Sequence, residues 1–127
     1  RKINADKFFK GMFETALKSG EIIEAIEFAI PEKSNYQKCP NPASRYAIVG
    51  VYVAKHKGGV NVAVTGAKPC VYNDKNLANT LSGNFSSSVV DNVSISSSDM
   101  NSDIHASAEY KANMIKVFAK KAVEASK

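Results

Sequence analysis

The chain has 127 residues, 44% of them hydrophobic, so it can build one compact core but is too short for two ordinary domains. It carries 17 Lys and Arg residues against 12 Asp and Glu, a formal charge of +5, and these cations are spread along the sequence without an arginine-rich run. This distribution argues against a nucleic-acid-binding arm.

Cysteine usage and hydropathy narrow the class of protein further. Cys39 and Cys70 form no C-x-x-C motif, so this chain alone offers neither an iron–sulfur site nor a zinc site, and two unpaired thiols fit a reducing cytoplasm. No window approaches the roughly 20 apolar residues of a membrane-spanning helix, and no signal peptide is visible. We expect one soluble, cytoplasmic domain over residues 1–127. Because the chain begins at Arg1 without an initiator Met, we interpret it as a piece of a longer protein.

The N-terminal part predicts a helix and then a strand. Apolar positions over residues 4–19 recur at spacings that place them on one stripe of a helix, which Gly20 can close. Residues 22–30 alternate apolar positions with Glu27 and small residues, which is typical of a strand, and Pro31 ends it.

The middle of the chain predicts an antiparallel sheet. A short strand is expected over residues 36–39, and the prolines make residues 38–44 a loop. Residues 45–55 are apolar at both odd and even positions, as in a central strand buried on both sides. Lys57-Gly58-Gly59 predicts a hairpin turn, and residues 60–65 alternate valine with other residues as a partner strand.

The remainder is helical in pattern after one more short strand, residues 70–72. One helix contains Leu77 and Leu81 and stops at Gly83; Ser86 caps a second helix. Residues 94–102 hold five serines and predict a solvated connection. A last helix is expected over residues 105–125. Its core-facing stripe is predicted to contain Tyr110, Met114, Ile115, Phe118, Ala122 and Val123.

Strands grouped ahead of helices predict an α+β fold: a three- to four-stranded antiparallel sheet followed by three helices packed on one face. Six short motifs also occur in a particular order along the chain. They are Asp6-x-Phe8-Phe9, Leu17-x-x-Gly20-Glu21-Ile22-Ile23 with Pro31, Tyr36-x-Lys38 with Pro42-Ala43-Ser44-Arg45-Tyr46-Ala47, Val51-Tyr52-Val53-Ala54, Gly58-Gly59-Val60, and Asp103-Ile104-His105-Ala106-Ser107-Ala108-Glu109-Tyr110-Lys111. Together they resemble the C-terminal domain of the FAD-binding medium subunit of molybdenum hydroxylases of the carbon monoxide dehydrogenase type.

The resemblance implies an oxidoreductase subunit in electron transfer. In such enzymes the molybdenum cofactor lies on a large subunit, two [2Fe-2S] clusters lie on a small subunit, and FAD is held mainly by N-terminal subdomains of the medium subunit. This chain would then help to enclose FAD and dock both partner subunits. Gly58 and Gly59 sit in a hairpin rather than before a helix, so no phosphate-binding loop is visible, and we expect this piece alone to bind FAD weakly or not at all and to be inactive. The substrate and the electron acceptor are not encoded here.

The resemblance also selects four cofactor-binding candidates. Tyr36 is expected beside the flavin ring, although an edge-strand tyrosine without function is the alternative. Lys38 and Arg45 would place positive charge near the flavin, whereas Arg45 could instead pair with a carboxylate or anchor the proline loop. Tyr46 would line the same loop, with core packing at a strand start as the favoured alternative.

Other polar residues have structural explanations. His105 stands next to a helix start without a visible carboxylate or nucleophile partner, so a structural role is favoured over proton transfer. Asp103, Ser107 and Glu109 are natural capping and helix-dipole partners. The competing functional hypothesis is a stand-alone basic module that binds RNA or an acidic protein, which salt-sensitive nucleic-acid binding by a colourless protein would support.

Overall fold

Alternating valines form the two central strands of the sheet in the computed structural model, which describes residues 1–127. The four-stranded sheet has the order β3-β4-β5-β6, and all neighbouring strands are antiparallel. A separate two-stranded sheet, β1-β2, lies in the N-terminal part. The elements are η1 (Ala5–Lys7), β1 (Phe9–Gly11), β2 (Glu14–Thr15), β3 (Lys33–Pro40), β4 (Ala47–His56), β5 (Gly59–Thr65), β6 (Tyr72–Asn73), α1 (Lys75–Gly83), η2 (Ser87–Asn92) and α2 (Ala108–Ala125).

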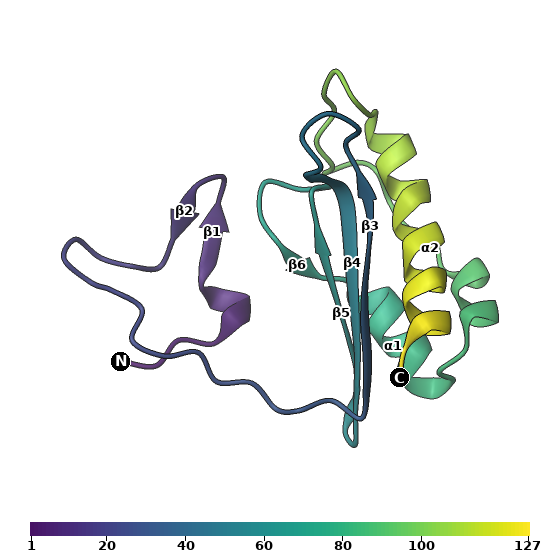
Figure 1. The fold of residues 1–127 in the computed structure, drawn as a ribbon, viewed down its shortest axis with the longest axis horizontal. Helices are drawn as coiled ribbons and strands as arrows, with labels where there is room; N and C mark the ends of the chain where they lie inside the picture. Colours follow the sequence, from purple (N-terminus) through teal and green to yellow (C-terminus); the bar gives the residue numbers. More distant parts are fainter.

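The helices cover one face of the large sheet, as predicted. Figure 1 shows α1, η2 and α2 on one side of the strands and the N-terminal hairpin on the other. Val49, Val51 and Val53 of β4 point into the helical layer and are fully buried, as are Val62 and Val64 of β5. Because successive strand residues face opposite sides, the intervening residues lie on the face away from the helices, which we call the open face.

The open face corrects one prediction about β4. We expected this strand to be buried on both sides, but Tyr52 is 38% exposed, while Ala54 is buried. The apolar run therefore reflects a strand that is fully covered by helices on one face only. The hairpin prediction is confirmed, since His56 pairs with Gly59 across the turn. The short strand predicted over residues 70–72 is displaced and pairs at Tyr72–Asn73.

Side-chain caps set the helix starts. Asp74 accepts a hydrogen bond from the backbone N–H of Leu77 at 3.0 Å, and Ser107 accepts one from that of Tyr110 at 3.2 Å. Ser86 caps a helix as predicted, but this helix is a 3₁₀ helix, η2. The last helix begins at Ala108, three residues later than expected, because Ser107 acts as its N-cap. No helix combines the length and apolar character that a membrane crossing requires.

The predicted core-facing stripe of α2 is correct in part, and the prediction of free cysteines is confirmed. Ile115, Ala119 and Ala122 of α2 are fully buried, but Tyr110 is 46% exposed and was wrongly assigned to the core stripe. The position that turns inward in that first turn is Lys111, which is 1% exposed. Both cysteines are free thiols, as expected.

The N-terminal helix predicted over residues 4–19 is absent. This stretch forms η1 and a small hairpin in which Phe9 pairs with Thr15, and Phe13 has a positive φ of 59° and is completely exposed. An amphipathic stripe stabilises a helix only when another surface buries it, and the elements of this stretch make their main contacts with one another. The predicted strand over residues 22–30 is extended but pairs with no other strand.

Candidate functional site

Two of the predicted site residues lie on the open face of the sheet, at neighbouring positions of one strand. Tyr36 of β3 pairs with Tyr52 of β4, and Lys38 pairs with Gly50. A Cβ atom at Gly50 would lie 2.2 Å from Oη of Tyr36 and 2.7 Å from Oγ1 of Thr65. Because Gly50 has no side chain, the hydroxyl group of Tyr36 can lie directly over its backbone on the neighbouring strand. The Tyr36 side chain remains 46% exposed.

The other two predicted residues lie in the loop between β3 and β4. Asn41 is buried, and its Oδ1 accepts hydrogen bonds from the backbone N–H groups of Ala43 and Ser44 at 2.9 and 3.2 Å. The loop closes when Asn41 donates its N–H to the carbonyl of Tyr46 at 2.7 Å and accepts the N–H of Arg45 at 2.9 Å. Arg45 adopts a left-handed φ of 64° to complete this turn.

The loop geometry decides between the alternatives for Arg45 and Tyr46. Tyr46 is 80% exposed, so the favoured expectation of core packing is wrong. The reason is that the turn closes through the backbone and β4 begins only at Ala47, which leaves the Tyr46 ring outside the core. Arg45 forms no ion pair, so the carboxylate alternative is also wrong, and it is the backbone of Arg45 that secures the loop.

Lys38 connects the strand to the loop. Its Nζ donates a hydrogen bond to the carbonyl oxygen of Arg45 at 2.9 Å and, like Arg45, it has no acidic partner. The structure thus brings together Lys38, Arg45 and Tyr46, with Tyr36 two positions before Lys38 on the same strand. We call these four residues the sheet-end cluster. It combines exposed aromatic surface with two positive charges that form no ion pair within the chain.

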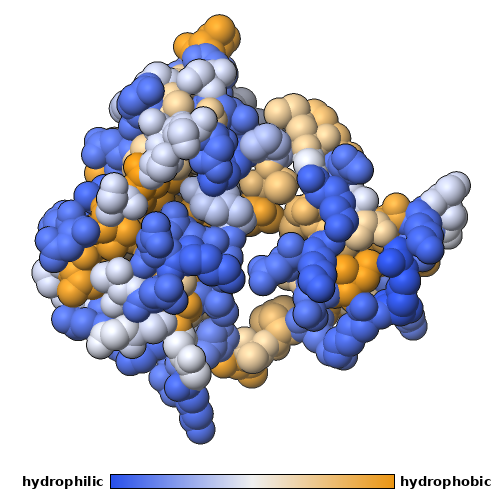
Figure 2. Space-filling model, turned by 180° about the vertical axis from the view of Figure 1, so that it is seen from behind, coloured by the Kyte–Doolittle hydropathy of each residue, from blue (hydrophilic) through white to orange (hydrophobic).

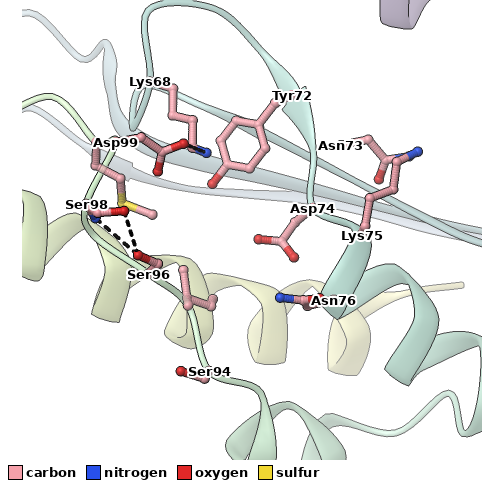
Figure 3. A pocket seen from close by; sticks show the side chains of 12 residues that line it. Lys68, Tyr72, Asn73, Asp74, Lys75, Asn76, Ser94, Ser96, Ser98 and Asp99 are labelled. Carbon is pink, nitrogen blue, oxygen red and sulfur yellow. Dashed lines mark hydrogen bonds and ion pairs between the residues drawn. The ribbon is translucent and has the colours of Figure 1, made fainter.

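A polar pocket of about 450 Å³ lies at the start of α1, and sequence reasoning did not find it. Figure 3 shows Tyr72 inside it, between Lys68 and Asp74. Nζ of Lys68 lies 4.3 Å from the Tyr72 ring centroid and donates to Asp99 at 2.5 Å. The buried Tyr72 hydroxyl has no hydrogen-bond partner, and its burial, reinforced by the two nearby aspartates, raises the pKa of Tyr72. This hydroxyl therefore stays protonated as a free donor.

The serine-rich connection predicted over residues 94–102 is indeed without regular structure, and it forms one wall of this pocket. Ile95 and Met100 nevertheless pack against the core from the same connection. A second, larger cleft of about 830 Å³ separates the N-terminal segment from the sheet and is lined by Phe28, Tyr52 and His56 among others. Figure 2 shows the opening between these two parts of the molecule.

None of these places gathers the side chains of a metal site. Three or more potential metal-ligating side chains gather nowhere in the chain. His105 is exposed, and its side chain has no partner. Asp103 has a structural role, although Ser107 and not Asp103 caps α2. Its Oδ1 accepts hydrogen bonds from the backbone N–H groups of His105 and Ala106, and its Oδ2 accepts one from Lys111 at 2.7 Å. The hydrogen bond from Lys111, aided by those two N–H groups, lowers the pKa of Asp103 to about 2.

No protein-family model matches the sequence, and no curated protein matches it either. Among solved structures, the fold is similar to that of quinoline 2-oxidoreductase from Pseudomonas putida 86, with a TM-score of 0.75 and 17% sequence identity. The match covers 98% of this chain and 47% of that chain, so the present chain spans about half the length of this structural relative. The likeness confirms the α+β fold predicted from the sequence.

Proposed function

We propose that the chain is the C-terminal domain of the FAD-carrying medium subunit of a molybdenum hydroxylase of the carbon monoxide dehydrogenase type. Three findings support this proposal: the order of the six motifs, the likeness to an oxidoreductase chain over 98% of the present chain, and the sheet-end cluster. The proposal makes residues 1–127 one domain of an oxidoreductase subunit. Flavin-binding subdomains would precede it, and the subunits with the iron–sulfur clusters and the molybdenum cofactor would be its partners in the cytoplasm.

The sheet-end cluster is the observation on which the proposed flavin contact depends. FAD is a planar, anionic cofactor, and it supplies the electron-transfer chemistry when it is bound. The cluster offers the exposed ring of Tyr46 and the two unpaired cations of Lys38 and Arg45, and no carboxylate forms an ion pair with either cation. These residues fit the ring end of such a cofactor. Gly58 and Gly59 form a hairpin turn, so the pyrophosphate would be held by other polypeptide.

Each residue of the cluster has a distinct proposed task. Tyr46, the most exposed, would lie against the flavin ring and exclude water from it. Lys38 is oriented by its hydrogen bond to the carbonyl of Arg45, so its charge is held at the mouth of the loop. Positive charge at this point would stabilise negative charge on the reduced ring system. Tyr36 would contribute its hydroxyl from the strand.

The test replaces single tyrosines in the complete subunit and measures FAD per protein. Tyr36→Ala and Tyr46→Ala should each lower flavin retention or electron transfer without unfolding the subunit. Tyr110→Ala is the matched control, because Tyr110 is as exposed as Tyr36 (46% in both) but belongs to α2, in the helical layer. Full FAD content and turnover in both cluster variants would refute the assigned role.

One observation favours a second function, the binding of single-stranded nucleic acid. The open face and its loop expose the rings of Tyr36, Tyr46 and Tyr52, and exposed aromatic rings beside lysine can stack successive bases. This function predicts that a colourless complete protein binds an oligonucleotide with an affinity that falls steeply as salt is raised. A yellow, FAD-containing protein that does not bind the oligonucleotide would exclude it.

A further inference from the structure

Residues 22–30, which we call the strap, present a surface that the rest of the chain leaves uncovered. None of their backbone N–H or C=O groups takes part in a backbone hydrogen bond. The side chains of Ile22, Ile26, Phe28 and Ile30 are between 77% and 90% exposed. Isolated apolar residues on a surface are ordinary, but four such side chains within nine consecutive residues mark a site of interaction.

The pattern along the strap specifies what kind of partner fits it. Over residues 25–30 the even positions hold Ile26, Phe28 and Ile30, whereas the odd positions hold two alanines and Glu27. Ile23 and Glu24 precede this alternation and do not follow it. In an extended chain this alternation places the large apolar side chains on one face and the small or charged ones on the other. An extended segment with one apolar face and unused backbone donors and acceptors fits the edge of a β-sheet.

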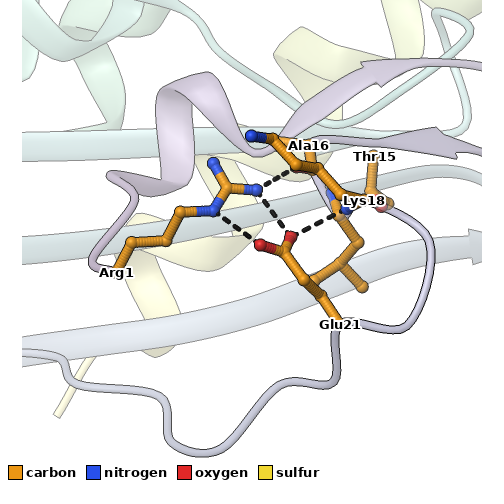
Figure 4. Close-up of polar contacts among 6 residues, drawn as sticks. Arg1, Thr15, Ala16, Lys18 and Glu21 are labelled. Atoms are coloured by element: carbon orange, nitrogen blue, oxygen red, sulfur yellow. Dashed lines mark hydrogen bonds and ion pairs between the residues drawn. The ribbon is translucent and has the colours of Figure 1, made fainter.

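The two ends of the strap are fixed within the chain, and its middle is held only by an exposed ion pair between Glu27 and Lys2. At one end the Arg1 guanidinium donates to both carboxylate oxygens of Glu21, at 3.0 and 2.6 Å, and to the carbonyl of Ala16 at 2.7 Å (Figure 4). At the other end Glu32 donates its N–H to the carbonyl of Lys55 at 2.7 Å. Nine residues at about 3.3 Å each span roughly 30 Å, the length of a long strand.

We propose that the strap joins, as a β-strand, the edge of a sheet in the polypeptide that precedes Arg1 in the complete subunit. This inference rests on the proposed function, which places flavin-binding subdomains ahead of this domain. The position of Arg1 argues for that occupant, because any polypeptide that arrives at Arg1 emerges beside Glu21, at the start of the strap. A sheet tethered at this point would meet the strap at a high effective concentration. More than half of the structural relative also lies outside the match.

The test measures amide hydrogen exchange over residues 22–30 in the complete, FAD-loaded subunit. Strand pairing at a sheet edge predicts that alternate amides exchange at least about 100-fold more slowly than in an unstructured peptide. Ile26→Asn should abolish this protection because it places an amide on the apolar face. Ala25→Asn is the matched control, since it changes the neighbouring exposed position on the opposite face, and it should leave the protection unchanged.

Three other outcomes overturn the inference. If the strap amides exchange freely while FAD is fully retained, the strap pairs with nothing, although the proposed function stands. If protection rises with protein concentration together with dimer formation, the occupant is a second copy of the chain. If Ala25→Asn removes the protection as completely as Ile26→Asn, the apolar face does not make the contact. Absence of FAD from the complete subunit would be read separately, as failure of the proposed function.

Discussion

The buried ammonium of Lys111 makes the stability of the fold depend on one carboxylate, Asp103. The Lys111 side chain is only 2% exposed, and Asp103 is the one acidic group paired with it, at 2.7 Å. Asp103→Ala would leave this charge buried without a partner and would also remove the acceptor for the N–H groups of His105 and Ala106. Breaking a fully buried pair from one side costs about 3–5 kcal/mol. Because the Asp103 side chain is itself 45% exposed, water can partly replace it, and we expect a loss of about 2–3 kcal/mol.

Removal of the Lys111 charge should reduce the stability of the fold much less than removal of its partner Asp103. Lys111→Met keeps an unbranched side chain in the same space and needs no counter-charge, so we expect a change of less than about 1 kcal/mol. The double variant, Asp103→Ala with Lys111→Met, should be only slightly less stable than Lys111→Met, because it loses only the two hydrogen bonds from backbone N–H groups to Asp103. The effects of the two substitutions on the free energy of unfolding should therefore be non-additive by about 2 kcal/mol. Urea denaturation of the four proteins measures these differences directly. Asp103→Ala alone should lower the melting temperature by about 10 °C.

The same pair predicts how stability depends on acid. The pKa of Asp103 is lowered to about 2 in the folded chain, chiefly by the hydrogen bond from Lys111, whereas the unfolded carboxyl titrates near 3.9. The pair therefore contributes fully above about pH 4, and its contribution is lost as the pH falls toward 2. Lys111→Met should lose less stability than the wild type between pH 5 and pH 2. Equal acid sensitivity, or equal losses from the two single variants, would show that the buried charge is not what makes Asp103 necessary.

Two glycine substitutions probe the sheet around the candidate site. Gly50→Ala should turn Tyr36 away from the sheet and cost about 1 kcal/mol of stability, because the new Cβ would lie 2.2 Å from Oη of Tyr36. The quenching of tyrosine fluorescence by a soluble quencher should then increase. Gly58→Ala is the control: no atom lies within 4 Å of its Cβ, so neither quenching nor stability should change. Gly66→Ala should lower the free energy of unfolding, measured by urea denaturation, by about 2–3 kcal/mol. Gly66 has a φ of +81°, and a Cβ there would lie 2.5 Å from the backbone carbonyl oxygen of Ile48, which cannot move aside. A loss below about 0.5 kcal/mol would contradict this reasoning.

Local signals made the sheet and helices predictable. Lys57-Gly58-Gly59 between two runs of alternating valine can form little other than a hairpin, and the structure pairs His56 with Gly59 across it. The caps Ser86 and Ser107 were also visible in the sequence, since a helix start needs an acceptor for its free N–H groups. Each of these features depends on residues that are near one another in the chain.

The failures involve contacts that depend on the folded path of the chain, which spacing in the sequence does not reveal. The stripe over residues 4–19 has helical spacing, but a helix requires a surface to bury it, and sequence spacing does not reveal whether that surface exists. Nothing in the sequence distinguishes Lys111 from the other cations spread along the chain, because its burial depends on how the chain folds Asp103 back over it. The contact between Lys38 and the carbonyl of Arg45 depends on the left-handed turn at Arg45, for which an arginine gives no warning.

The strap and the open-face residues of the sheet-end cluster lie on the same side of the sheet (Figure 1). The helices bury the face formed by Val49, Val51 and Val53, whereas Tyr36 and the strap lie on the side away from them, toward the N-terminal hairpin. Phe28 of the strap lines the same cleft as Tyr52 of the open face. One body that covered this side could therefore satisfy both the unpaired backbone of the strap and the uncompensated charges of the sheet-end cluster. Such a body would also cover the large apolar side chains that the strap exposes.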